Sequence, residues 1–172
     1  MELKGSRNIN ASRETVWEAL NDPEVLKACV PGCSEMIRDD AGGFSAVVTQ
    51  KVGPVKATFK GSVTLSDIIP LESYTISGEG KGGAAGFAKG GARVKLADTD
   101  EGTELSYEVE ARVGGKLAQI GSRLVDGFAK KMADKFFENF QLAVEAPEDE
   151  ADTTDEPEAK KKGWFKRMVG KG

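Results

Sequence analysis

A chain of 172 residues can bury one good hydrophobic core, and a second compact domain is rare at this length. It contains no histidine, the side chain that most often serves in acid–base catalysis near neutral pH and in binding transition metals. The two cysteines, Cys29 and Cys33, are too few for a thiolate zinc site or a framework of disulfides. These absences predict a protein that is not an enzyme, with no catalytic residues and no metal site.

Charge divides the chain into three parts. Residues 1–146 carry 18 basic and 21 acidic side chains in mixed order, so no strong field marks this part as a binder of nucleic acid. Residues 147–159 carry seven acids and no base, whereas residues 160–172 carry six bases and no acid. We therefore expect a folded domain over 1–146, an acidic disordered linker over 147–159 and a basic aromatic tail over 160–172.

The first part of the domain predicts a strand followed by two short helices. The strand covers residues 2–9, and the segment Asn10-Ala11-Ser12 offers a capping side chain just before the first helix. Asp22 can cap the second helix, with Pro23 at its first position. Pro31 and the glycine that follows it end this helix.

Residues 33–114 predict an antiparallel meander of about six or seven strands. Apolar and polar residues alternate with a period of two, most clearly over residues 55–65 and 105–113, and turn residues separate the runs. Alternation of this kind buries one face of a sheet and leaves the other face in water.

Residues 117–144 predict one long helix, because apolar residues recur there at steps of three or four. Its length is roughly 45 Å at 1.5 Å per residue. A second apolar set that includes Val125 and Ala129 broadens the stripe, which is typical of a helix lying across a concave sheet. The order of elements therefore predicts an α+β fold, a curved antiparallel sheet around a long C-terminal helix.

Residues 78–83, with the sequence GEGKGG, have the glycine spacing of a dinucleotide-binding loop. Such a loop needs a helix directly afterwards to present its N-terminus to phosphate. Residues 86–96 instead show the alternation of a strand, so turns and strand bending explain these glycines better. We do not expect nucleotide binding.

The buried face of the predicted sheet carries many small residues, which leaves room beneath the helix. If the helix does not fill this space, an apolar cavity remains; alternatively, the helix packs closer over the small residues. Gln50, Tyr74 and Tyr107 share the inward parity and can hydrogen-bond a ligand carbonyl. The predicted ligand site comprises Gln50, Ala57, Phe59, Val63, Tyr74, Tyr107, Ala111, Leu124, Phe128 and Met132.

The last part of the chain predicts a membrane-docking tail. In a helical arrangement its apolar side chains would gather on one face, with cations around them. Each cation near an anionic leaflet contributes about 1 kcal/mol, and interfacial aromatic residues add to this. Two alternatives stay open, a tail kept soluble by its charge and a tail that docks on a protein. The predicted docking residues are Lys160, Lys161, Lys162, Trp164, Phe165, Lys166, Arg167 and Met168.

Four separated motifs resemble those of one family. They are VPGC at residues 30–33, GPVKATFKG at 53–61, GFAKG at 86–90 and GGKLAQIGSR at 114–123. Together they resemble the G subunit of carbon monoxide dehydrogenase (CoxG), over about residues 1–146. The resemblance implies a START-like (SRPBCC) helix-grip fold, with a hydrophobic cavity between the sheet and the long helix.

The resemblance also implies a partner. Proteins of this family accompany molybdenum hydroxylases of the carbon monoxide dehydrogenase type, and their implied role is to recruit them to the membrane. The chain itself has no recognisable molybdenum, flavin or iron–sulfur motif. We therefore expect an accessory protein rather than the catalyst.

These features lead to a hypothesis of ligand carriage. The cavity would hold a hydrophobic isoprenoid, with a respiratory quinone (menaquinone or ubiquinone) as the bound ligand and no covalent cofactor. We expect a cytoplasmic protein, peripheral on the anionic inner face of the cell membrane, because the chain starts without a leader and no segment approaches the roughly 18 apolar residues of a spanning helix. Two alternatives are a membrane-recruitment or assembly factor without ligand, and a START-like enzyme acting on a small hydrophobic substrate.

Overall fold

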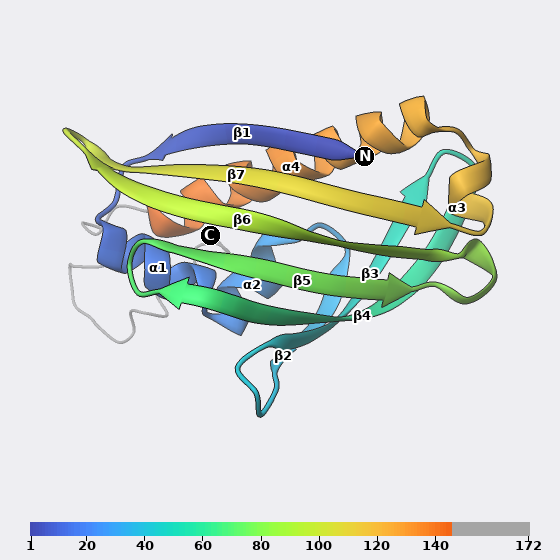
Figure 1. The fold of residues 1–172 in the computed structure, drawn as a ribbon, viewed down its shortest axis with the longest axis horizontal. Helices are drawn as coiled ribbons and strands as arrows, with labels where there is room; N and C mark the ends of the chain where they lie inside the picture. The colour runs from blue at the N-terminus through green and yellow to red at the C-terminus, as the bar shows by residue number, and fades with distance from the viewer. Residues whose placement is uncertain (146–172) are drawn as a thin grey trace.

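The computed structural model describes residues 1–145, which form one curved sheet with helices against its concave face (Figure 1). All strands pair antiparallel, in the order β1-β7-β6-β5-β4-β3-β2. The predicted linker and tail lie outside the described residues. The strands are β1 (Glu2–Ile9), β2 (Cys33–Arg38), β3 (Phe44–Val52), β4 (Val55–Ile69), β5 (Ser73–Lys81), β6 (Phe87–Thr99) and β7 (Gly102–Gly114).

The two predicted starts of short helices are confirmed. The Ser12 hydroxyl oxygen accepts a hydrogen bond from the Thr15 amide at 3.2 Å, and Asp22 Oδ1 accepts one from the Glu24 amide at 2.9 Å. No helix within residues 1–145 has the length and apolar character that crossing a bilayer requires. The helical segments are α1 (Arg13–Leu20), α2 (Pro23–Cys29), the 3₁₀ turn η1 (Gly83–Ala85), α3 (Lys116–Gln119) and α4 (Ser122–Val144).

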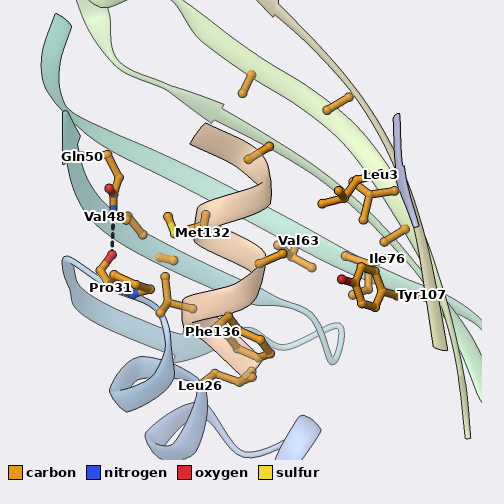
Figure 2. Close-up of a pocket in the computed structure, with 18 of the residues that line it drawn as sticks. Leu3, Leu26, Pro31, Val48, Gln50, Val63, Ile76, Tyr107, Met132 and Phe136 are labelled. Carbon is orange, nitrogen blue, oxygen red and sulfur yellow. Dashed lines mark hydrogen bonds between the residues drawn. The ribbon is translucent and has the colours of Figure 1, made fainter. Parts of the chain in front are cut away.

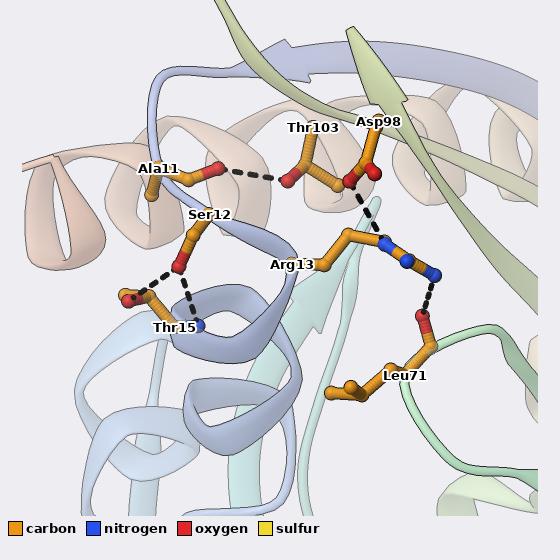
Figure 3. A network of polar contacts seen from close by, with 7 residues as sticks. All are labelled: Ala11, Ser12, Arg13, Thr15, Leu71, Asp98 and Thr103. Carbon is orange, nitrogen blue, oxygen red and sulfur yellow. Dashed lines mark hydrogen bonds and ion pairs between the residues drawn. The ribbon is translucent and has the colours of Figure 1, made fainter.

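Polar contacts fasten α1 to two hairpins at one end of the sheet, which we call the α1 end (Figure 3). Arg13 Nε donates to Asp98 Oδ1 at 2.8 Å, and Arg13 Nη1 donates to the carbonyl oxygen of Leu71 at 3.0 Å. The buried Thr103 hydroxyl donates to the carbonyl oxygen of Ala11 at 2.7 Å. These contacts join the β4–β5 and β6–β7 hairpins to the start of α1 and close this end of the fold.

The hydrophobic core also lies at the α1 end, between α1, α2, the second half of α4 and the sheet. Phe140 of α4 is fully buried and stacks on Phe136, with ring centroids 5.8 Å apart. The core residues are Ile9, Val16, Ala19, Leu20, Val25, Cys29, Tyr74, Val94, Leu96, Leu105, Phe137 and Phe140.

The prediction of one continuous helix over residues 117–144 is wrong. α3 ends at Gln119, and α4 begins at Ser122. Between them, Gly121 has a φ of +101°, a conformation that L side chains rarely adopt. The chain turns at this glycine, so α3 packs against β7 and η1 while α4 crosses the sheet (Figure 1).

The glycine-rich segment at residues 78–83 forms the end of β5 and the turn into η1, and a strand follows it. Gly86 has a φ of +112°, and a Cβ atom there would lie 1.9 Å from the carbonyl oxygen of Gly114. The β5–β6 connection can therefore approach the end of β7 only without a side chain at this position. The expected strand and turn context is confirmed. We call this end of the molecule, where the β3–β4, β5–β6 and β7–α3 connections lie, the α3 end.

Candidate ligand-binding cavity

An apolar cavity of about 640 Å³ lies between the inner face of the sheet and α4 (Figure 2). The period-two alternation produces this face, because on β4 and β7 the outward neighbours of the lining residues are exposed. Figure 2 shows Met132 of α4 and Val63 and Tyr107 of the sheet among the side chains of the wall. The lining includes Leu3, Leu26, Pro31, Met36, Ala46, Val48, Gln50, Phe59, Val63, Tyr74, Ile76, Ala92, Leu105, Tyr107, Val109, Ala111, Val113, Val125, Phe128, Ala129, Met132, Ala133 and Phe136.

Small side chains on both walls keep the cavity open. Ala92 and Ala111 line it from the sheet, and Ala129 and Ala133 line it from α4. A methyl group on each side cannot bridge the space between the helix and the sheet. The structure therefore holds a cavity rather than the close-packed helix that the sequence left as an alternative.

Burial varies along the cavity, and half-buried side chains lie between the buried residues of the α1 end and the buried Val52 and Leu117 at the α3 end. On β7, Leu105 is 1% exposed, whereas Val109 and Val113 are only half-buried. On α4, Phe140 is fully buried, whereas Phe128 is half-buried. Apolar side chains that point inward and yet remain partly exposed lie next to space that the protein does not fill. The cavity is thus closed at the α1 end and borders unfilled space in the half nearer the α3 end, which we call the open half, although Val52 and Leu117 close part of that end at 5% and 4% exposed.

Tyr74 is a buried polar residue in the lining at the closed end of the cavity. The residue is 5% exposed, and its ring packs edge-on against Trp17 with centroids 5.4 Å apart. Burial raises the pKa of Tyr74 above its ordinary value, so the hydroxyl stays protonated and can donate a hydrogen bond. Within residues 1–145 this hydroxyl has no partner, and a buried polar group without one is unfavourable. An acceptor oxygen on a ligand would satisfy it.

The other two predicted polar residues already have neighbours in the protein. The Gln50 side-chain amide donates to the carbonyl oxygen of Pro31, which ties β3 to the turn before β2 (Figure 2). The Tyr107 ring stacks on Phe137 with centroids 5.0 Å apart, and its hydroxyl lies over Gly5 of β1. Both residues line the cavity.

The structure places eight of the ten predicted ligand-site residues in the lining, and whether they bind a ligand stays a prediction. Ala57 is outside the lining, which corrects the expectation. It faces inward but carries one methyl group between the longer side chains of Gln50, its cross-strand partner, and Phe59. The eight residues in the lining are Gln50, Phe59, Val63, Tyr74, Tyr107, Ala111, Phe128 and Met132.

Leu124 is also outside the lining, which corrects the expectation that it faces the cavity. Its side chain is 49% exposed and lies 3.4 Å from the Cβ position of Gly53, against the β3–β4 hairpin. Because α4 begins only after Gly121, the stripe that faces the cavity starts at Val125. Sequence reasoning also missed Leu3 of β1, which lines the cavity. The pairing of β1 with β7 places Leu3 on the inward face, and this pairing is visible only in the structure.

Comparisons with known proteins agree with this architecture. The family model for the G subunit of carbon monoxide dehydrogenase (CoxG) matches residues 5–145. The chain belongs to this family. The resemblance inferred from the four motifs is therefore confirmed, whereas no curated protein matches the chain at a significant level.

Several solved structures share the fold of this CoxG-family chain. A conserved protein from Geobacillus kaustophilus is 31% identical with a TM-score of 0.77, and the match covers 84% of this chain and 95% of that one. A START superfamily protein from Mycobacterium smegmatis is 14% identical with a TM-score of 0.63, covering 84% and 97%. A protein from Thermus thermophilus is 15% identical with a TM-score of 0.64, covering 85% and 98%. The predicted START-like helix-grip fold is confirmed.

Proposed function

We propose that this CoxG-family protein carries a hydrophobic isoprenoid, a respiratory quinone of the menaquinone or ubiquinone type, as an accessory of a molybdenum hydroxylase of the carbon monoxide dehydrogenase type. The observation that carries this proposal is the cavity of about 640 Å³, whose wall is almost wholly apolar. Pockets of roughly 300–1,000 Å³ enclose most of the surface of a small organic ligand. Membership of the CoxG family supports the choice of partner.

The chemistry of the cavity suits a long apolar chain with a polar head. An apolar cavity offers water too few hydrogen bonds and so favours an apolar occupant. At the closed end the Tyr74 hydroxyl would donate to a quinone carbonyl oxygen. The half-buried side chains toward the α3 end, such as Phe59 and Phe128, would then cover the isoprenoid chain.

A carrier is needed because a long-chain quinone is insoluble in water, whereas the hydroxylase partner acts outside the bilayer. The cavity would shield the chain in transit, and the partner would supply the catalysis. We propose a cytoplasmic, peripheral location on the inner face of the cell membrane. The tail residues Trp164 and Phe165, which lie outside the described residues, would contact the anionic bilayer with the lysines around them.

Organic extraction of the purified full-length chain, followed by mass spectrometry, tests the carriage proposal. We expect an isoprenoid quinone near one equivalent per chain, enriched over the quinone content of the host membranes. Recovery of phospholipid alone, or of no hydrophobic molecule from protein purified without detergent, would contradict it.

Replacing Tyr74 with phenylalanine is expected to weaken quinone binding without destabilising the ligand-free domain. The hydroxyl has no protein partner within residues 1–145, so its loss removes no bond from the free protein. A hydrogen bond to the ligand contributes about 1 kcal/mol, so affinity for a short-chain quinone analogue should fall about fivefold by tryptophan fluorescence titration. Tyr107→Phe is the matched control, and a larger loss in the control than in Tyr74→Phe would refute the assigned anchor.

A further inference from the structure

Charges that are mixed along the sequence separate in space, because an antiparallel meander sends successive connections to opposite ends. The connections at the α3 end, residues 51–56, 81–89 and 112–123, carry seven lysines and arginines and no acid. The hairpins at the α1 end, residues 66–73 and 98–104, carry six acids and no base. The folded domain is therefore basic at one end and acidic at the other, although its sequence predicted no strong field.

Three pairs of cations lie directly opposite each other on neighbouring strands toward the α3 end, where Glu2 and Glu110 form one acidic pair. Opposed like charges destabilise a sheet, so folding does not explain this arrangement. All six cationic side chains are exposed. Among the described residues only Lys81 forms an ion pair, with Glu79 at 4.0 Å, and Glu79 also lies directly opposite Lys89. The pairs are Lys51 with Lys56, Lys60 with Lys81, and Lys89 with Arg112.

Two exposed apolar side chains stand among these cations. Phe87 is 41% exposed and lies directly opposite Lys81 in the β5–β6 ladder. Leu124, already noted as exposed, follows Arg123 in the first turn of α4. Cations that surround protruding aromatic and aliphatic groups are typical of surfaces that sit at a bilayer interface.

We propose that the α3 end of the folded domain is a docking surface for an anionic lipid bilayer, and that docking brings the open half of the cavity against the lipid. A bilayer accommodates Phe87 and Leu124 in its interface, whereas nucleic acid or an acidic protein surface accounts only for the cations. The surface is separate from the predicted tail. The docking proposal rests on the proposed function in one respect only, namely that docking would serve the transfer of a ligand between the bilayer and the cavity.

The test is sedimentation of the full-length chain with phosphatidylcholine vesicles, with and without phosphatidylglycerol. The variant Lys56→Glu, Lys60→Glu turns two like-charge pairs into opposite-charge pairs, so its thermal stability should be unchanged or raised. One lysine near an anionic leaflet is worth about fivefold in affinity, so this variant should bind anionic vesicles at least about 25-fold more weakly.

The matched control is Lys27→Glu, Lys95→Glu, which makes the same change in net charge on exposed residues of α2 and of β6 near the α1 end. It should retain most of the vesicle binding. Leu124→Gln should weaken binding without loss of stability, because the side chain is exposed. The variant Trp164→Ala, Phe165→Ala measures the contribution of the tail separately.

Equal vesicle binding by Lys56→Glu, Lys60→Glu and the control would overturn the docking proposal. It would also be overturned if the first variant lost capture of the hydroxylase while keeping vesicle binding, because the surface would then be a protein interface. Ligand content is measured in the same preparations. If the chain binds vesicles through these lysines but never carries quinone, only the carriage proposal is refuted and the docking proposal stands.

Discussion

Replacing Ala111 with tryptophan is expected to abolish co-purification of the ligand while the domain stays folded. Ala111 lines the open half of the cavity between Gly90, which has no side chain, and Met1, which exchanges backbone hydrogen bonds with it, so an indole ring there would enter the cavity beside Met1. The ring would occupy volume that the isoprenoid needs. Quinone recovered by extraction should fall at least about tenfold, which corresponds to about 1.4 kcal/mol of binding free energy.

The matched control is Glu110→Trp, at the adjacent position on the exposed outer face of β7. It adds the same ring outside the cavity and should keep the quinone content of the unmodified protein. Ala92→Phe is a second blocking variant on β6, in case the larger ring at position 111 prevents folding. A folded blocking variant with undiminished quinone would show that the ligand binds elsewhere.

The walls of the cavity could be predicted from the sequence because alternation along a strand is a local property. Val63, Tyr107 and Ala111 were placed on the inward face by parity alone, and the structure puts all three in the lining. The capping roles of Ser12 and Asp22 were predictable for the same reason, since each depends only on the next few residues.

Features that depend on chain reversals or on distant pairing could not be predicted. Gly121 interrupts the helix because of its backbone conformation, and the apolar pattern runs through this position without a sign of it. Leu124 was misplaced as a result. The separation of charge needs the order of the strands, because Lys60 and Lys81 meet only when β4 pairs with β5.

The two halves of the fold differ in how tightly they are packed, and Tyr74 belongs to the packed half. The closed α1 end holds the one predicted polar anchor that is deeply buried, and the same end carries the hydrophobic core. Stability can therefore come from one half of the domain while the other half keeps space for a ligand. This division predicts that side chains of the same type on α4 contribute unequally to folding.

Phe140→Ala and Phe128→Ala are expected to differ widely in their effect on the free energy of unfolding of the ligand-free domain. Phe140 is fully buried in the core and stacks on Phe136, so its truncation should destabilise the domain by about 3–5 kcal/mol. Phe128 borders the cavity and is half-buried, so its truncation enlarges existing space and should cost about 1 kcal/mol or less.

Urea unfolding of the two variants, freed of ligand by extraction and refolding, measures both values, and equal slopes with denaturant would establish that the same surface is exposed in each case. Phe128→Ala should nevertheless lose affinity for a quinone analogue, because its ring forms part of the proposed wall around the isoprenoid chain. If Phe128→Ala destabilised the free domain as much as Phe140→Ala, the first half of α4 would be packed tightly against the sheet in solution. The cavity would then be collapsed without ligand, and a recruitment role with no cargo would account for the domain better than carriage.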